Sequence, residues 1–185
     1  GFDTLYGRVR VMQHEAPGEH WTYRFVEPPP ELARDIYMYW EVNGVLAHVR
    51  EKVMPTGDVV VIFNLGPAQA LVDRHDETRE TVFRSSFISG LQEQFLITAS
   101  HEASWMCGVR LTPLGAYRIL GLPMREVANT VIDFDAVMGP AAALMLERLR
   151  NAGSPAARFM LLDRFLSERL RQPHEPANEV VWAWD

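Results

Sequence analysis

Apolar residues in the first two-thirds of the chain recur at every second position in short runs, which is typical of β-strands. In the clearest run, at 36–42, one face carries Ile36, Met38, Trp40 and Val42. A continuous apolar run at 59–63 predicts a buried strand. The same reasoning predicts further strands at 5–12, 21–26, 68–72, 82–89, 93–100 and 103–111.

Turn-forming residues separate these runs at regular intervals. Three consecutive prolines at 28–30 form a stiff break, and one helical turn is expected at 31–34. Asn43-Gly44 is a strong hairpin signal, so residues 45–53 are predicted to form the return strand. About eight or nine short strands with this spacing predict a barrel or a sandwich.

From Thr112 onward the pattern changes to helical signals. Thr112-Pro113 and Ser154-Pro155 each place a capping residue before a proline at the first helical position. Gly139-Pro140 opens another helix, and Gly121 stands where a C-terminal glycine belongs. Residues 178–185 are expected to begin a further helix after Pro173 and Pro176.

The last complete helix carries an apolar stripe at helical spacing, made of Phe159, Leu162, Leu166 and Leu170. We predict that this stripe forms the contact of a homodimer. The alternative is that the stripe packs on the strands of its own chain.

Composition narrows the function classes. Hydrophobic residues make up 48% of the chain, which is enough for a packed core. The net charge of −6 disfavours a surface that binds phosphate backbones. The single cysteine, Cys107, excludes an internal disulfide, fits a reducing cytosol and is expected to be a small core residue. No secretory leader and no membrane span are expected, so we predict a cytoplasmic protein without a membrane partner.

Pro55, Gly57 and Asn64 match the second motif of cupin barrels, P-x-G-x-x-H-x-x-x-N, at the right spacing. The proline and glycine would turn the chain into a strand, and the asparagine would tie off the strand end. Val60 stands where that motif has its metal-binding histidine, and His48 is alone where a first motif would need two. A barrel of this kind is therefore predicted to hold no metal and no cofactor. The alternative is an ordinary turn before a buried strand.

Aromatic walls and a facing charge are usual in small-molecule sites. The candidate ligand-binding residues are Tyr39, Trp40, Arg50, Val60, Ile62, Trp105 and Arg110. An arginine that faces into the barrel would orient an anionic ligand. The alternatives are core packing for the aromatic residues and ordinary surface for the arginines.

Signatures of catalysis are missing. The sequence has no G-x-S-x-G, Walker loop or dinucleotide fingerprint. His101-Glu102 opens a near miss of the zinc-protease motif, in which Trp105 replaces the second histidine. Asp133 and Asp135 are interpreted as helix caps. We therefore expect no catalytic residues and predict that the chain is not an enzyme.

The order of several segments carries a family resemblance: Pro28 to Leu32, Tyr39-Trp40-Glu41, Met54 to Asp58 running into Ile62 to Gly66, Phe87 to Gly90, Gly108 to Leu111, Gly121-Leu122-Pro123 and Ser154 to Phe159. This series resembles the N-terminal half of a group of AraC-family transcription regulators. The resemblance implies a cupin-like barrel, then linker helices, then helix-turn-helix units that bind DNA.

The predicted fold is therefore α+β, a cupin-like antiparallel β-barrel followed by C-terminal helices. Residues 1–111 would be the barrel, 112–172 a helical linker and dimerisation region, and 173–185 the start of a linker to a DNA-binding domain outside this chain. The predicted function is effector sensing and dimerisation for a bacterial regulator, with a small-molecule effector, a homodimer partner, and DNA bound only through that further domain. The alternatives are a small cupin-type enzyme, such as an isomerase or dioxygenase, and a stand-alone small-molecule binding module.

Overall fold

The computed structural model describes residues 9–46, 59–73, 76, 78, 80–83, 85–90, 95–98, 103–123 and 131–172. Its strands are β1 (Arg10–Ala16), β2 (Glu19–Val26), β3 (Ile36–Val45), β4 (Val59–Asn64), β5 (Gln69–Asp73), β6 (Glu80–Phe83), β7 (Ser86–Ser89), β8 (Phe95–Thr98), β9 (Ser104–Leu111) and β10 (Val131–Asp133). The helical elements are η1 (Pro30–Leu32), α3 (Pro113–Leu120), α5 (Phe134–Met138), α6 (Pro140–Asn151) and α7 (Pro155–Arg171).

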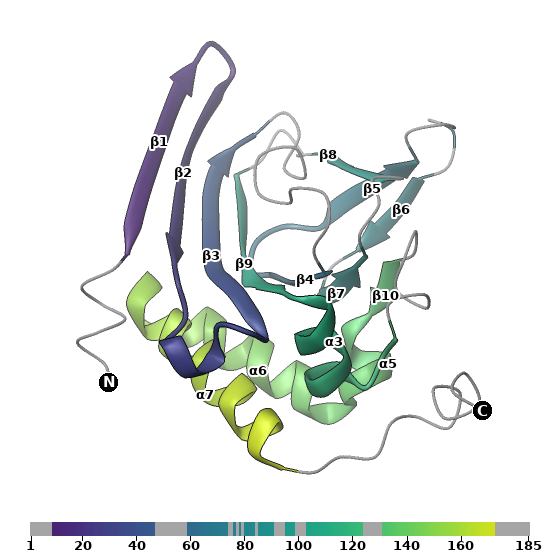
Figure 1. Ribbon diagram of the computed structural model, residues 1–185. Coiled ribbons are helices and arrows are strands. Elements are labelled where there is room, and N and C mark those ends of the chain that lie inside the picture. The colour runs from purple at the N-terminus through teal and green to yellow at the C-terminus, as the bar shows by residue number, and fades with distance from the viewer. Residues whose placement is uncertain are drawn as a thin grey trace.

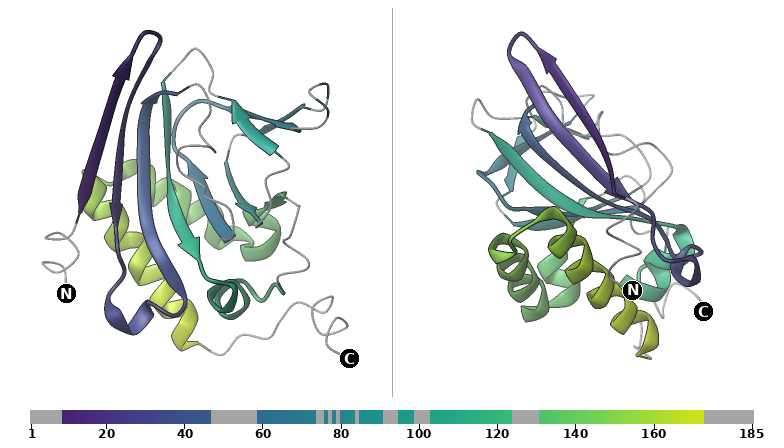
Figure 2. Two further views of the ribbon diagram at one scale, coloured as in Figure 1. Left: turned by 45° about the horizontal axis from the view of Figure 1, so that its top comes forward. Right: turned by 90° about the vertical axis from the view of Figure 1, so that its left-hand side faces the viewer.

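The strands form two antiparallel sheets. The larger sheet has seven strands in the order β1-β2-β3-β9-β4-β7-β10, and the smaller one has the order β6-β5-β8. Helices α6 and α7 cover one face of the larger sheet, and the smaller sheet lies on its other side (Figures 1 and 2). We call these two sides the helix face and the inner face. The α+β class is confirmed, but no strand pairing in the described part of the chain closes the two sheets into a barrel.

Local capping signals are confirmed. The Thr112 hydroxyl accepts a hydrogen bond from the Gly115 backbone N–H, and Gly121 ends α3 in the left-handed conformation. The Ser154 hydroxyl caps α7 in the same way. Asp133 caps α5 by accepting from the Asp135 backbone N–H at 3.0 Å, as expected for a capping aspartate.

The predicted hairpin at Asn43-Gly44 is wrong. Strand β3 continues through both residues to Val45 and pairs with β2 on one side and β9 on the other. Gly44 opposes Trp21 of β2 and Ser104 of β9, with φ of 128°. Strand pairing on both edges therefore overrides the local turn preference of the dipeptide.

The helical region is not purely helical. Strand β10 lies within the segment 112–172 and extends the large sheet by pairing with β7. The predicted strand at 82–89 is two strands, β6 and β7, which belong to different sheets. The expected helix at 178–185 and most of the expected return strand at 45–53 lie outside the described residues.

The apolar stripe of α7 is used within the chain. Phe159, Leu162 and Leu166 are 1–3% exposed and belong to the core between the sheet and the helices, and Leu170 packs against that core while partly buried. The dimer prediction therefore cannot rest on this stripe, because its side chains already pack on the chain's own sheet, as the alternative held.

Gly108 lies where a side chain would collide with a neighbouring strand of the large sheet. It lies in β9 opposite Ile62 of β4 and Trp40 of β3. A Cβ atom at this position would lie 1.9 Å from the Val61 carbonyl oxygen and 3.0 Å from the Trp40 ring. Glycine is therefore the residue that allows this approach.

Candidate ligand-binding site

Strand register arranges the inner face of the large sheet in rows. Since side chains alternate between faces, residues paired across neighbouring strands point to the same side. One row, which we call the Arg110 row, includes Met38, Arg110, Val60 and Ser89 and continues to Val131 of β10. The next row, the Trp40 row, consists of Phe25, Trp40, Gly108, Ile62 and Phe87.

Two hydrogen-bond donors converge on the Met38 thioether in the Arg110 row. The Tyr23 hydroxyl and Nη1 of Arg110 each lie 3.5 Å from the Met38 sulfur. A thioether is a weak acceptor, whereas a phenol and a guanidinium are strong donors. The Tyr23 hydroxyl therefore donates to a weak acceptor at the sulfur.

Two further donors are buried here without an acceptor. Ser89 Oγ and Trp40 Nε1 have no hydrogen-bond partner among the described residues. Ser89 is 1% exposed and Trp40 is fully buried. Leaving such a group unsatisfied costs about 1–3 kcal/mol, so a buried orphan is informative about what a site binds.

Aromatic rings surround the Arg110 end of this face. The Arg110 guanidinium lies over the Tyr37 ring, 5.6 Å from its centroid, and the Tyr23 and Phe25 rings stack at 5.4 Å. Burial raises the pKa of the Tyr23 hydroxyl to about 12, and the nearby Arg110 charge partly opposes this shift. Tyr23 therefore remains a neutral donor at physiological pH.

The predicted ligand-binding residues are divided by the sheet. Trp40, Val60, Ile62 and Arg110 lie together on the inner face. Tyr39 and Trp105 alternate to the helix face, and Arg50 lies outside the described residues. The structure thus brings four of the seven predicted residues to one surface.

Tyr39 and Trp105 take part in polar contacts that dock α7 on the sheet. The Tyr39 hydroxyl donates to Asp163 of α7 at 2.8 Å. Trp105 Nε1 donates to Glu41 at 2.9 Å, and Glu41 also forms a buried ion pair with Arg158 of α7. The Arg158 guanidinium lies 5.0 Å from the Trp105 ring centroid.

Cys107 lies in the core beside this ion pair. Its side chain is fully buried, as expected for a small core residue. Burial raises the pKa of the Cys107 thiol, the Glu41 charge raises it further, and Arg158 opposes the shift. The thiol therefore stays protonated and is a poor nucleophile.

Sequence reasoning missed Tyr23, Met38 and Ser89 as members of the site. A signal for Tyr23 was present, because Trp21, Tyr23 and Phe25 alternate and so share one face of a strand. Ser89 carried no such signal, since its face follows only from the pairing of β7 with β4.

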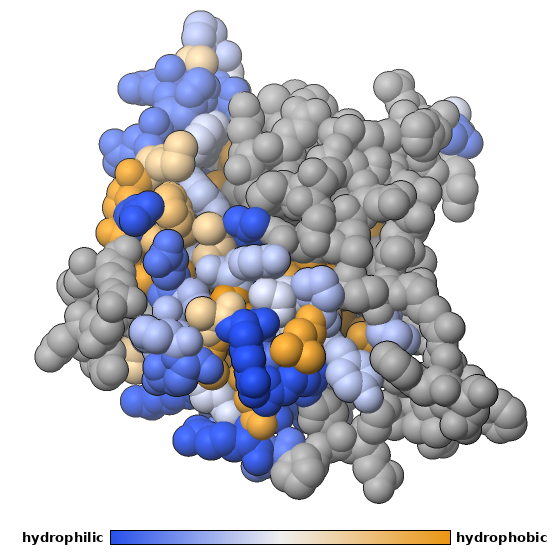
Figure 3. All heavy atoms as spheres, in the orientation of Figure 1, coloured by the Kyte–Doolittle hydropathy of each residue, from blue (hydrophilic) through white to orange (hydrophobic). Residues whose placement is uncertain are grey.

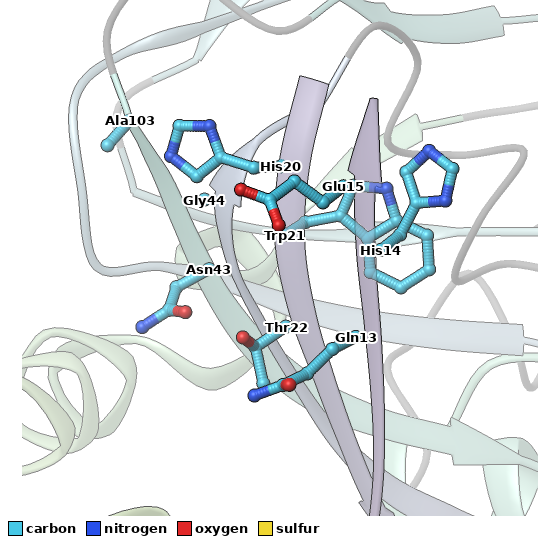
Figure 4. Close-up of a pocket in the computed structure, with 9 residues that line it drawn as sticks. All are labelled: Gln13, His14, Glu15, His20, Trp21, Thr22, Asn43, Gly44 and Ala103. Atoms are coloured by element: carbon cyan, nitrogen blue, oxygen red, sulfur yellow. The ribbon is translucent and has the colours of Figure 1, made fainter. Parts of the chain in front are cut away.

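A second candidate is a groove of about 610 Å³ over β1, β2 and β3. Figure 4 shows its lining residues, among them Gln13, Glu15, His20 and Asn43, whose side chains are exposed. The rings of His14 and Trp21 stack at 5.2 Å beside it. Polar side chains in contact with water need no ligand, so the inner face is the stronger candidate.

The cupin-type motif is only partly described. Asn64 closes the end of β4, because its side chain donates to the Pro67 carbonyl at 2.8 Å and accepts from the Gly66 N–H at 3.2 Å. This is the strand-end role expected for the asparagine. Pro55, Gly57, His48 and His101 lie outside the described residues. Within the described ranges, no three His, Cys, Asp or Glu side chains are grouped as a metal site.

Comparison with known families gives one match. The model of the family described as "Domain of unknown function (DUF6597)" matches residues 24–133. This range begins in β2 and ends with β10, so it contains both rows of the inner face. No curated protein matches the chain.

Two solved proteins show weak structural similarity. The iron(II) form of HppE aligns with 55% of this chain and 56% of its own, at 11% identity and a TM-score of 0.39. Streptomyces albus HEPD, bound to its substrate 2-hydroxyethylphosphonate and to iron(II), aligns with 98% of this chain and 44% of its own, at 14% identity and a TM-score of 0.36. The chain thus spans about half the length of the solved proteins it matches.

The prediction that this chain is not an enzyme is contradicted and is not retained. Both solved neighbours hold iron(II), at TM-scores below 0.5. No helix in the described residues is long and apolar enough to cross a membrane.

Proposed function

This chain belongs to the DUF6597 family of domains of unknown function, and we propose that it is a small-molecule-binding domain whose ligand lies on the inner face of the large sheet. One observation carries the proposal: two buried hydrogen-bond donors on this face, the Ser89 hydroxyl and Trp40 Nε1, have no acceptor among the described residues. A third donor, the Tyr23 hydroxyl, donates to a thioether, which is a weak acceptor. A ligand that supplies acceptor atoms would satisfy these donors.

The apolar surroundings support the same proposal. Val42, Val60, Ile62, Phe87 and Met106 are buried and form one cluster with Trp40. Small-molecule sites combine a mostly apolar lining with a few placed polar groups. The Ser89 hydroxyl, Trp40 Nε1 and the Tyr23 hydroxyl would be those groups here.

A pair of serine variants tests the proposal. Ser86 and Ser89 lie in the same strand on opposite faces, and neither hydroxyl has a partner among the described residues. Removing a buried orphan hydroxyl is neutral or stabilises a protein by up to about 1 kcal/mol. Both Ser86→Ala and Ser89→Ala should therefore fold at least as stably as the wild-type chain.

Only Ser89→Ala should affect a ligand. A diverse metabolite library is screened by thermal shift, since a ligand that binds the folded state raises the melting temperature. A ligand found in this way should bind Ser89→Ala more weakly and Ser86→Ala as tightly as the wild-type chain. A screen without ligands, or ligands indifferent to Ser89→Ala, would contradict the proposal.

The same ligand separates two narrower proposals. The AraC resemblance, which rests on the order of sequence segments, gives the ligand the role of an effector for a regulator. The enzyme alternative gives it the role of a substrate. Nuclear magnetic resonance spectra of the ligand, recorded during incubation with the protein, distinguish the two, because a substrate is converted and an effector is not.

A further inference from the structure

We infer that the ligand of the inner face is an uncharged, mainly apolar carbonyl compound whose oxygen accepts a hydrogen bond from Trp40 Nε1. This inference rests on the proposed function and specifies its ligand. An indole N–H can only donate, whereas a hydroxyl such as that of Ser89 can donate or accept. Trp40 Nε1 is buried without a partner among the described residues, so the ligand atom that satisfies it must be an acceptor.

Gly108 allows the indole of Trp40 to lie over the neighbouring strand. Trp40 of β3 opposes Gly108 of β9, and the Trp40 Cζ2 atom lies 3.0 Å from where a Gly108 Cβ would stand. Nε1 and Cζ2 are bonded to the same ring carbon. The unsatisfied N–H therefore belongs to the edge of the ring that reaches over β9, toward the middle of the sheet.

The side chains around this donor are apolar and buried. Val42, Val60, Ile62 and Met106 share a cluster with Trp40 and are at most 2% exposed. Moving an ion into such surroundings costs far more free energy than moving a neutral polar group, because the ion loses more hydration. The lining therefore favours an uncharged ligand.

The guanidinium groups and carboxylates that alternation assigns to the described inner face already have contacts within the chain. They are Arg10 over the Phe25 ring, Glu19 beside His14, Arg110 over the Tyr37 ring, and Asp133 at the start of α5. Except for Arg110, they lie on β1, β2 and β10, toward the two ends of the sheet. The middle of this face therefore offers no dedicated counter-charge to an ionic ligand among the described residues.

A carbonyl oxygen is the acceptor that suits Trp40 Nε1. It accepts without a proton of its own, whereas an alcohol also brings an O–H that needs an acceptor. Among the described members of the cluster, only the Tyr23 hydroxyl and the weakly accepting Met106 thioether offer side-chain acceptors. An alcohol O–H would be poorly satisfied here, which costs free energy. Ketones, esters and lactones avoid this cost.

The position of Ser89 indicates how far the ligand extends. Ser89 of β7 lies two strands and one row from Gly108, which corresponds to about 10 Å across the sheet and about 7 Å along it. Val60 and Ile62 of β4 lie between them. A ligand that reaches both donors therefore has an apolar body of medium length, with a second oxygen at its far end.

An apolar margin leads from solvent toward this site. Met12 of β1 opposes Tyr23 of β2, which opposes Val42 of β3, so their side chains form a row on the inner face. Met12 is 52% exposed, Tyr23 9% and Val42 0%. Figure 3 shows apolar side chains on the surface over β1 and β2, where Val11 is exposed as well. Such a margin suits the approach of an uncharged ligand.

Matched probes test the inference with the chain as it is. Menthone and camphor are compared with the alcohols menthol and borneol, and methyl octanoate and methyl benzoate with the anions octanoate and benzoate, by isothermal titration calorimetry. At least one carbonyl compound should bind at least about fivefold more tightly than its matched partner, the difference expected when a buried polar group is left unsatisfied. The inference fails if no carbonyl compound binds, or if the alcohols and anions bind as tightly.

Nuclear magnetic resonance locates the contact in the unaltered chain. The chain has five tryptophans, each of which gives an indole N–H signal. The Trp40 signal should move to higher proton frequency when the tightest carbonyl probe binds, because this N–H gains an acceptor. Trp105 is the internal control, since its Nε1 already donates to Glu41 on the helix face. A Trp40 signal that stays in place while the probe is bound would overturn the assignment.

Two tryptophan variants complete the test. Trp40→Phe removes the donor and identifies its signal, and it should abolish the preference for ketone over alcohol. Trp105→Phe removes an indole N–H from the helix face and should keep this preference. Thermal melting shows whether each variant folds. If Trp40→Phe does not fold, nuclear Overhauser effects to the methyl groups of its cluster assign the signal in the wild-type chain.

Failure of this inference is distinguishable from failure of the proposed function. If metabolites without a carbonyl group bind in a Ser89-dependent way and no carbonyl probe does, the ligand class is wrong and the site is right. If neither the library nor the carbonyl probes bind, both are wrong.

Discussion

Two buried tyrosines, Tyr23 and Tyr39, point to opposite faces of the large sheet and have different partners. Tyr23 donates to a thioether on the inner face, and Tyr39 donates to the Asp163 carboxylate on the helix face. Burial raises the pKa of both hydroxyls, and for Tyr39 the negative charge of Asp163 and the hydrogen bond raise it further. Each residue therefore resists ionisation in the folded chain.

These shifts predict a loss of stability in alkali. A tyrosine ionises near pH 10 in the unfolded chain, and Tyr23 ionises near pH 12 in the folded one. Because the folded pKa is the higher one, the stabilisation is complete below pH 10 and is lost as the pH rises from 10 toward 12. Urea unfolding at pH 8 to 11 should show this decline.

Tyr39→Phe isolates the contribution of the Tyr39 hydroxyl to this pH-dependent stability. The variant should lose about 1 kcal/mol at pH 8, because the hydrogen bond to Asp163 is absent. Its deficit should shrink above pH 10, since phenylalanine does not ionise. A pH profile parallel to that of the wild-type chain would contradict the assignment of the shift to Tyr39.

At the scale of elements, α7 is fixed to β3 by polar contacts within an apolar interface. Glu41 and Arg158 are 1% and 7% exposed, and Arg158 also donates to the Ala152 carbonyl at 3.0 Å. A buried pair adds little net stability, but removing one partner leaves the other charge buried and alone. The pair therefore joins α7 to β3 inside the core.

A double-mutant cycle measures this coupling. Arg158→Leu should cost about 3–5 kcal/mol, because Glu41 is left as an unpaired buried charge. Adding Glu41→Gln should recover much of this loss, since glutamine is neutral and can still accept from Trp105. Urea unfolding of the four chains gives the coupling energy. Simple additivity of the two substitutions would contradict a direct ion pair.

At the scale of the whole molecule, the α7 stripe predicts the effect of a charge in the core. Leu166 is 3% exposed, whereas Leu144 of α6 is 48% exposed. Leu166→Glu should therefore cost more than about 4 kcal/mol and unfold the chain, while Leu144→Glu should stay within about 0.5 kcal/mol of the wild type. Circular dichroism and sedimentation check both variants. A folded Leu166→Glu monomer derived from a wild-type dimer would restore the dimer role of the stripe.

Other predictions about partners stay predictions. A homodimer would require a surface other than Phe159, Leu162 and Leu166, because these side chains are buried in one chain. Binding of DNA through a further domain concerns residues outside this chain.

The sequence predicted the elements better than their assembly. Capping residues such as Thr112 and Ser154 act within one helical turn, so their signals can be read locally. The hairpin predicted at Asn43-Gly44 is wrong for the opposite reason, because pairing with β2 and β9 decides the conformation of these two residues.

The candidate site shows the same limit. Alternation placed Trp40 and Met38 on one face, and the structure agrees. Alternation within a strand does not show which face of the sheet the helices cover. The predicted ligand-binding set therefore combines Tyr39 and Trp105 of the helix face with residues of the inner face. Ser89 and Arg110 are 21 positions apart and meet in one row only through β4, a relation that no local pattern contains.

Gly108 has a consequence for how this family can diverge. A Cβ atom at this position would lie 1.9 Å from the Val61 carbonyl oxygen. Because every residue has a backbone carbonyl, no substitution at position 61 can remove this obstacle. A residue larger than glycine at position 108 would therefore require β9 and β4 to move apart. Relatives that keep glycine here would share the geometry beneath Trp40 whatever they bind, and a relative with alanine would have had to separate β9 from β4 first.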